Sequence, residues 1–84
     1  MFLRPGRLYA LMANNTKPTE SVVAVLEKRK EDKVLLSRRF KNPESKHHSL
    51  IWTGMNKCEV IAMTDNSKTE MGLEVIVWDI GATS

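Results

Sequence analysis

The 84-residue chain contains one cysteine, four glycines and no apolar run close to the length of a bilayer span. A single cysteine excludes an internal disulfide framework and zinc sites built from several thiolates. A transmembrane helix needs roughly 20 consecutive apolar residues, and none is present. The apolar stretch over residues 8–13 follows two arginines but is too short for a secretion signal. The sequence therefore predicts a cytoplasmic protein.

Groups that carry enzymatic chemistry are equally sparse. The two histidines, His47 and His48, are adjacent, and adjacent residues of an extended chain point in opposite directions. No acid or thiol cluster with ligand spacing lies beside them. The glycines form no phosphate-binding loop. The sequence thus predicts no catalytic site, no metal site and no bound cofactor, and it indicates a protein that is not an enzyme.

The chain contains 42% hydrophobic and 27% charged residues. This composition and the length of the chain predict one small globular domain covering residues 1–84. The net charge of +3 hides an asymmetry. Residues 1–48 hold 11 Lys and Arg against 5 acids, whereas residues 49–84 hold 2 against 5. Most of the positive charge lies in residues 27–33 and shortly after them. Such an asymmetry indicates an anionic partner.

Two valine- and leucine-rich runs flank this basic segment, at residues 21–26 and 34–40. One helix over residues 19–40 is the rival interpretation, because Glu, Lys, Arg and Leu favour helix. However, residues 27–33 contain no apolar side chain, so nearly two helical turns would have no face to bury. Valine also packs better on a pleated surface. We therefore expect a β-hairpin with a four- or five-residue loop whose tip lies near residues 29–32.

Short strand-like runs also occupy much of the remaining chain. A capping-box spacing between Ser67 and Glu70, with Gly72 as a stop, predicts one helical turn before the last strand. Neighbouring strands with short connections predict an all-β fold. We expect a small antiparallel meander of five to six strands, curled or closed into an SH3-like barrel that hides its edges. The further strands are expected at residues 7–13, 49–53, 58–64 and 73–80.

Strand alternation divides the second half of the hairpin into two faces. Val34, Leu36, Arg38 and Phe40 would face the core, with Arg38 at its rim. The opposite face would present cations to a phosphate backbone. Trp52 and Trp78 lie in the most apolar strands and are expected in the core. The candidate nucleic-acid-binding residues are Lys28, Arg29, Lys30, Lys33, Arg38, Arg39 and Lys41, with Tyr9 and Phe40 as stacking platforms.

Two classes of partner therefore fit the sequence. The first is RNA or single-stranded DNA, bound through the hairpin of residues 27–41. The alternative is a protein-binding module, such as a small phage- or plasmid-type inhibitor that docks on an acidic surface of a larger protein. The last strand carries apolar side chains on both faces, which indicates that a partner covers one of them. A homodimer that pairs through this strand is one such arrangement.

Overall fold

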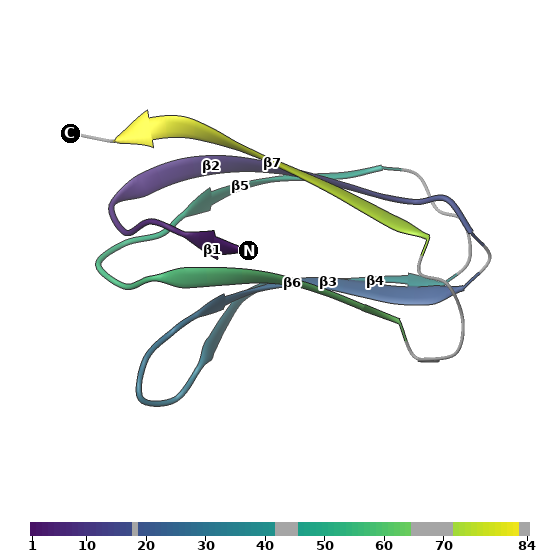
Figure 1. The fold of residues 1–84 in the computed structure, drawn as a ribbon, viewed down its shortest axis with the longest axis horizontal. Coiled ribbons are helices and arrows are strands. Elements are labelled where there is room, and N and C mark those ends of the chain that lie inside the picture. Colours follow the sequence, from purple (N-terminus) through teal and green to yellow (C-terminus); the bar gives the residue numbers. More distant parts are fainter. Residues whose placement is uncertain (18, 42–45, 65–71, 83–84) are drawn as a thin grey trace.

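The computed structural model describes residues 1–17, 19–41, 46–64 and 72–82, which form seven β-strands in two antiparallel sheets (Figure 1). The four-stranded sheet has the order β1-β6-β3-β4, and the three-stranded sheet has the order β5-β2-β7. No helix in the described part of the chain could cross a lipid bilayer. The strands are β1 (Phe2–Leu3), β2 (Arg7–Asn15), β3 (Glu20–Glu27), β4 (Lys33–Lys41), β5 (His47–Trp52), β6 (Cys58–Thr64) and β7 (Leu73–Ala82).

The expected all-β class is confirmed, but the meander and the closed barrel are not. Only β3 and β4 are neighbours in both sequence and sheet, and no described strand pairs across the two sheets. The sheets instead stack on each other, because β2 and β3 each need a second layer to cover their buried side chains. The helical turn expected at residues 67–70 lies outside the described residues.

The basic hairpin is present, and the single-helix alternative is wrong. β3 pairs with β4 in antiparallel register, from Glu20 opposite Lys41 to Glu27 opposite Lys33. Residues 28–32 form the connecting loop of the expected length. A register shift after Val25 places Leu26 opposite Val34. Val34 was expected to face the core but is 58% exposed at this irregular end of the strand.

The hydrophobic core lies between the two sheets. From the three-stranded sheet, Leu11 and Ala13 of β2 point inward, and from the four-stranded sheet Val23 and Val25 of β3 do so. Phe40 of β4 has no exposed surface. These residues alternate with more exposed ones, as expected for strands that bury one face. The alternation therefore decides which side chains of each strand point outward, away from the core.

Gly72 precedes β7 at a point where two segments of backbone approach closely. A Cβ atom at this position would lie 2.5 Å from Cβ of Lys17 and 2.7 Å from its backbone nitrogen. The backbone N–H and the hydroxyl of Thr16 each donate a hydrogen bond of 2.7 Å to the Gly72 carbonyl. Glycine is required here because any side chain would collide with the neighbouring backbone.

We predict that Phe40→Ala lowers the free energy of unfolding by about 3–5 kcal/mol, because it removes a fully buried ring and leaves a cavity. For a domain of this size that is a large part of the total stability, which is typically about 5–15 kcal/mol. Val34→Ala on the same strand is the control and should cost less than about 1 kcal/mol, since Val34 is largely exposed. Urea unfolding followed by circular dichroism measures both. Equal midpoints for the two variants would contradict the placement of Phe40.

Candidate functional site

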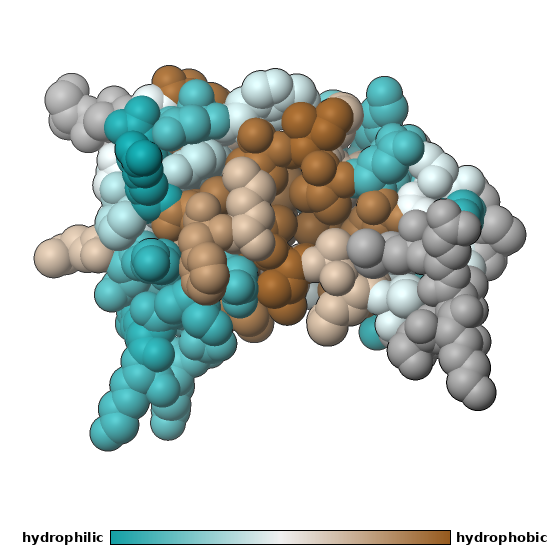
Figure 2. All heavy atoms as spheres, viewed as in Figure 1, coloured by the Kyte–Doolittle hydropathy of each residue, from teal (hydrophilic) through white to brown (hydrophobic). Residues whose placement is uncertain are grey.

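The tip of the hairpin holds two of the predicted cations in ion pairs. Lys28 Nζ lies 2.7 Å from a carboxylate oxygen of Asp32 and 3.9 Å from one of Glu59. The hydrogen bond to Asp32 raises the pKa of Lys28. Arg29 donates a hydrogen bond of 2.9 Å to Glu27. The hairpin tip, a hydrophilic lobe at the lower left of Figure 2, thus compensates part of its own positive charge.

The remaining predicted cations are divided between the two sides of β4. Arg39 and Lys41 share the outward side, as the alternation predicts, whereas the register shift after Val25 sets Lys33 opposite Glu27, on the same side as Arg38. All three cations are exposed. Arg39 donates a hydrogen bond of 3.1 Å to Glu20 on the neighbouring strand. Lys30 is exposed in the hairpin loop. The structure therefore brings Arg39 and Lys41 together on the outward side of β4 and separates them from Lys33.

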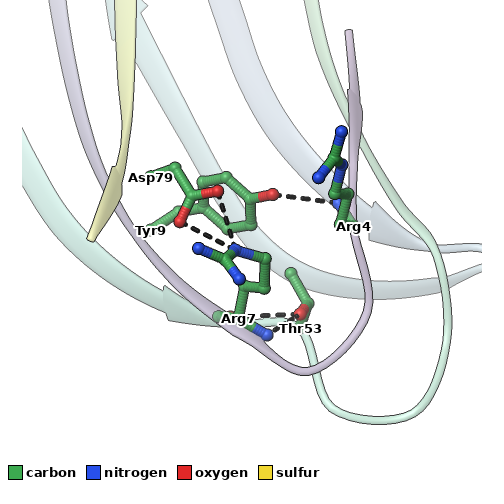
Figure 3. A network of polar contacts seen from close by, with 5 residues as sticks. All are labelled: Arg4, Arg7, Tyr9, Thr53 and Asp79. Atoms are coloured by element: carbon green, nitrogen blue, oxygen red, sulfur yellow. Dashed lines mark hydrogen bonds and ion pairs between the residues drawn. The ribbon is translucent and has the colours of Figure 1, made fainter. Parts of the chain in front are cut away.

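Neither predicted stacking platform is accessible to a nucleic-acid base. Phe40 is fully buried, and Tyr9 is 5% exposed. The Tyr9 hydroxyl accepts a hydrogen bond of 3.0 Å from the backbone nitrogen of Arg4, which fixes the ring within the structure (Figure 3). Arg38 lies over the Phe40 ring at 5.9 Å, exposed at the rim of the core. The basis for assigning stacking to Tyr9 and Phe40 is thereby removed.

A polar network joins one end of the three-stranded sheet (Figure 3). Arg7 Nε donates to both carboxylate oxygens of Asp79, at 2.7 and 2.9 Å, which links β2 to β7 and raises the pKa of Arg7. The Arg7 backbone N–H donates to the hydroxyl of buried Thr53, which donates back to the Arg7 carbonyl. Since Thr53 directly follows β5, the network ties together all three strands of this sheet.

The two tryptophans were expected in the core, and this prediction is wrong. Trp52 is 48% exposed and Trp78 is 49% exposed. In the register of the three-stranded sheet, Trp52 lies opposite Leu8 and Trp78 lies opposite Ala10. Ile51 takes the buried position next to Trp52 instead. Both tryptophans therefore point away from the core, on the outer side of the three-stranded sheet.

Aliphatic side chains surround these tryptophans and form a hydrophobic surface. Ala10 lies between Leu50 on β5 and Trp78 on β7, and these residues line a groove of about 330 Å³. At the outward positions of the three described strands the alternation places no lysine or arginine, and Glu74 supplies a negative charge. We call this surface the apolar face; it consists of Leu8, Ala10, Met12, Leu50, Trp52, Ile76 and Trp78.

The two histidines, His47 and His48, begin β5. Ser49 Oγ is 2.8 Å from Nε2 of His47, a contact that a nucleophilic serine and its base also make. Burial and the charge of Arg38 lower the pKa of His47. A neighbouring cation opposes the imidazolium that a general base must form, and no described carboxylate contacts the ring. In the described residues no three metal-ligating side chains of His, Cys, Asp or Glu gather.

We predict that the native protein shows tryptophan emission close to that of an exposed indole, with efficient quenching by acrylamide. The reason is that both tryptophans of the chain are half exposed. Trp52→Phe and Trp78→Phe, measured separately, should each retain a quenchable signal from the other residue. A blue-shifted emission that resists quenching in either variant would contradict the outward placement of its remaining tryptophan.

We also predict that Glu27 makes the stability of the protein depend on pH. Its carboxylate accepts hydrogen bonds from Asn56, at 2.7 Å, and from Arg29, and these lower its pKa below the ordinary 4.5. The unfolded chain therefore binds this proton more readily. The stabilisation is complete above pH 4.5 and is lost as the pH falls through the lowered pKa.

The measurement is urea unfolding between pH 7 and pH 3, with Glu27→Gln as the comparison. The variant should be less stable than the unchanged protein at pH 7, and the difference should shrink toward pH 3. A difference that stays constant over this range would contradict the assigned role of the carboxylate.

Comparison of the chain with protein-family models, with curated proteins and with solved structures finds no match. The function of the chain is therefore inferred from the chemistry of its surfaces.

Proposed function

We propose that this chain is a protein-binding module that docks on a larger cytoplasmic protein through the apolar face. The observation that carries the proposal is the pair of half-exposed tryptophans, Trp52 and Trp78, which lie on opposite edge strands of the three-stranded sheet. Contiguous apolar surface on a small domain typically marks an interaction site. Tryptophan is also enriched among the residues that contribute most to protein–protein binding.

The distribution of charge favours a protein over a nucleic acid as the partner. Single-stranded nucleic acid binds where exposed aromatic rings lie beside cations that follow the phosphates. Here the exposed tryptophans lie on the outer side of the three-stranded sheet. Arg39 and Lys41 lie on the outer side of the other sheet, across the core, and Lys33 lies at the hairpin end of the same edge strand. Stacking and phosphate contacts would therefore fall on opposite sides of the molecule.

The shape of the apolar face fits an amphipathic helix of the partner. Three strands spaced about 4.8 Å apart give a surface about 14 Å wide, close to the 10–12 Å diameter of a helix. Ala10 forms the floor of the groove between Leu50 and Trp78, which leaves room for one apolar side chain of the partner. Insertion of an apolar helix face into such a groove is a common mode of recognition. A small inhibitor that blocks a larger protein would use this kind of contact.

The proposal is tested by filling the groove. We predict that Ala10→Phe weakens binding of a purified partner at least about tenfold, because the new ring occupies the space of the inserted side chain. Leu50→Asp should weaken it similarly, since the partner would have to bury a carboxylate. The control is Lys30→Ala in the hairpin loop, which should change the affinity by less than about twofold. The measurement is calorimetric titration with a partner first identified by cross-linking, after circular dichroism shows that the variants fold.

The nucleic-acid hypothesis makes the opposite prediction, which a labelled single strand can check. Fluorescence anisotropy at two ionic strengths would reveal binding that weakens steeply with salt. If such binding is found and is lost when Lys28, Arg29, Lys30 and Lys33 become alanine, the hairpin is the functional surface and our proposal is wrong. Equal binding of the partner by Ala10→Phe and the unchanged protein would also overturn it.

A further inference from the structure

One flank of the molecule lies between an edge strand of each sheet. Within the described residues, β4 pairs only with β3, and β5 pairs only with β2. In Figure 1 both strands lie at the back, β5 in the upper layer and β4 in the lower. A groove of about 250 Å³ lies between them, lined by Leu35 and Leu36 of β4 and by residues 49–52 of β5. This flank therefore combines a strand edge with an apolar groove.

The second half of β4 is a regular edge. Leu35 has no partner on β3, which marks a bulge, and the pairing with β3 is continuous from residue 36 to residue 41. A bulge interrupts the addition of a further strand, so the edge that another chain can join is residues 36–41. This segment contains no proline. Every second residue of it directs its backbone N–H and C=O away from β3.

Alternation gives this edge two different sides. Residues 36, 38 and 40 lie opposite buried residues of β3 and therefore face the other sheet, whereas residues 37, 39 and 41 face outward. A strand added beside β4 would follow the same alternation. Stacked sheets lie about 10 Å apart, so the inward side chains of the added strand would fill the space toward β5. An aliphatic residue opposite Leu36 would then enter the groove.

The two strands that border the groove carry positive charge and no acid. β4 contains four lysines and arginines, and β5 contains two histidines. Arg39 lies 3.1 Å from Glu20 of β3, but these side chains are 48% and 50% exposed, and such a surface pair is weak enough to exchange for another carboxylate. Burial and the charge of Arg38 lower the pKa of His47 on β5. Positive charge from β4 therefore acts across the flank.

We propose that an acidic, extended segment of another protein adds to residues 36–41 of β4 as a further strand, with aliphatic side chains in the groove and carboxylates beside Arg39 and Lys41. Strand addition is a common mode of peptide recognition, in which backbone hydrogen bonds give affinity and pockets for alternate side chains give specificity. A single-stranded nucleic acid would supply the negative charge but neither the strand backbone nor the aliphatic side chains. The chemistry of the flank therefore favours a peptide.

This site goes beyond the helix-binding surface of the proposed function and meets it at β5. Leu50 and Trp52 line the groove and also belong to the apolar face. Arg39 and Lys41 lie outside the apolar face, on the other sheet. Variants on β4 therefore test the strand site without altering the apolar face.

The probe is a synthetic hexapeptide of alternating glutamate and valine with blocked ends, whose valines share one side of the extended chain. We predict that the protein binds it at least about tenfold more tightly than a peptide of alternating glutamate and serine, which has the same charge without aliphatic side chains. Calorimetric titration measures both. Hydrogen exchange followed by nuclear magnetic resonance should show new protection of the amides in residues 36–41 that point away from β3.

Charge reversal on β4 tests the role of the cations. Arg39→Glu combined with Lys41→Glu should weaken binding of the glutamate–valine peptide at least about tenfold, and should allow binding of a lysine–valine peptide instead. The control, Lys30→Glu combined with Lys57→Glu, makes the same change of net charge at exposed positions away from β4 and should alter the affinity less than about twofold. If circular dichroism shows that the reversal disturbs the fold, Arg39→Gln combined with Lys41→Gln should weaken binding at least about threefold.

Four results would overturn the inference: no binding of the glutamate–valine peptide at about 1 mM, equal binding of the glutamate–serine peptide, binding without new protection in residues 36–41, or displacement of the peptide by an equal concentration of single-stranded DNA. Ala10→Phe separates the two proposals. It should keep the peptide, since Ala10 does not line the groove between β4 and β5. Because this assay contains no helical partner, its failure would leave the proposed function intact.

Discussion

The contact between the inner faces of the two sheets determines which side chains this small domain exposes. Leu11 and Ala13 of β2 lie in the same core as Val23 and Val25 of β3, and burial of these four residues fixes which residues of each strand point inward. The residues between them must then point outward, whatever their chemistry. Trp52 and Trp78 are exposed for this reason, because Ile51 and Val77 occupy the inward positions beside them.

The same constraint separates the chemistry of the chain onto two sides. The outward positions of the three-stranded sheet hold apolar residues, whereas β4 of the other sheet holds lysine and arginine. A partner that needs both stacking and positive charge would have to reach around the core. A partner that needs only apolar contact finds it on one flat surface. This separation is the physical reason for our proposal of a protein partner, although most of the positive charge of the sequence lies in and beside the basic hairpin.

The sequence predicts the features that depend on neighbouring residues. The hairpin follows from the absence of any apolar side chain in residues 27–33. The core position of Phe40 follows from its even spacing from Leu36, although the same residue was also predicted to stack on bases. The pairing of distant strands, such as β1 with β6, leaves no local signal, and β1 has only two residues. The sequence indicates that a partner covers one face of β7, but it places Trp52 and Trp78 in the core. Because β7 is apolar on both faces, its pattern alone does not show which face is buried.

Within the described residues β7 pairs only with β2, and the apolar pattern of β7 also leaves the middle of its other edge without charge. A strand that must pack against the core with Val75 and Val77 cannot carry charges at those positions. Its outward residues could carry them, yet Ile76 and Trp78 do not, and the charges stand only at residues 74 and 79. Acids at both ends of an apolar segment would repel an identical strand in many registers. The charges at the two ends of this segment thus limit the pairing of β7 with a copy of itself.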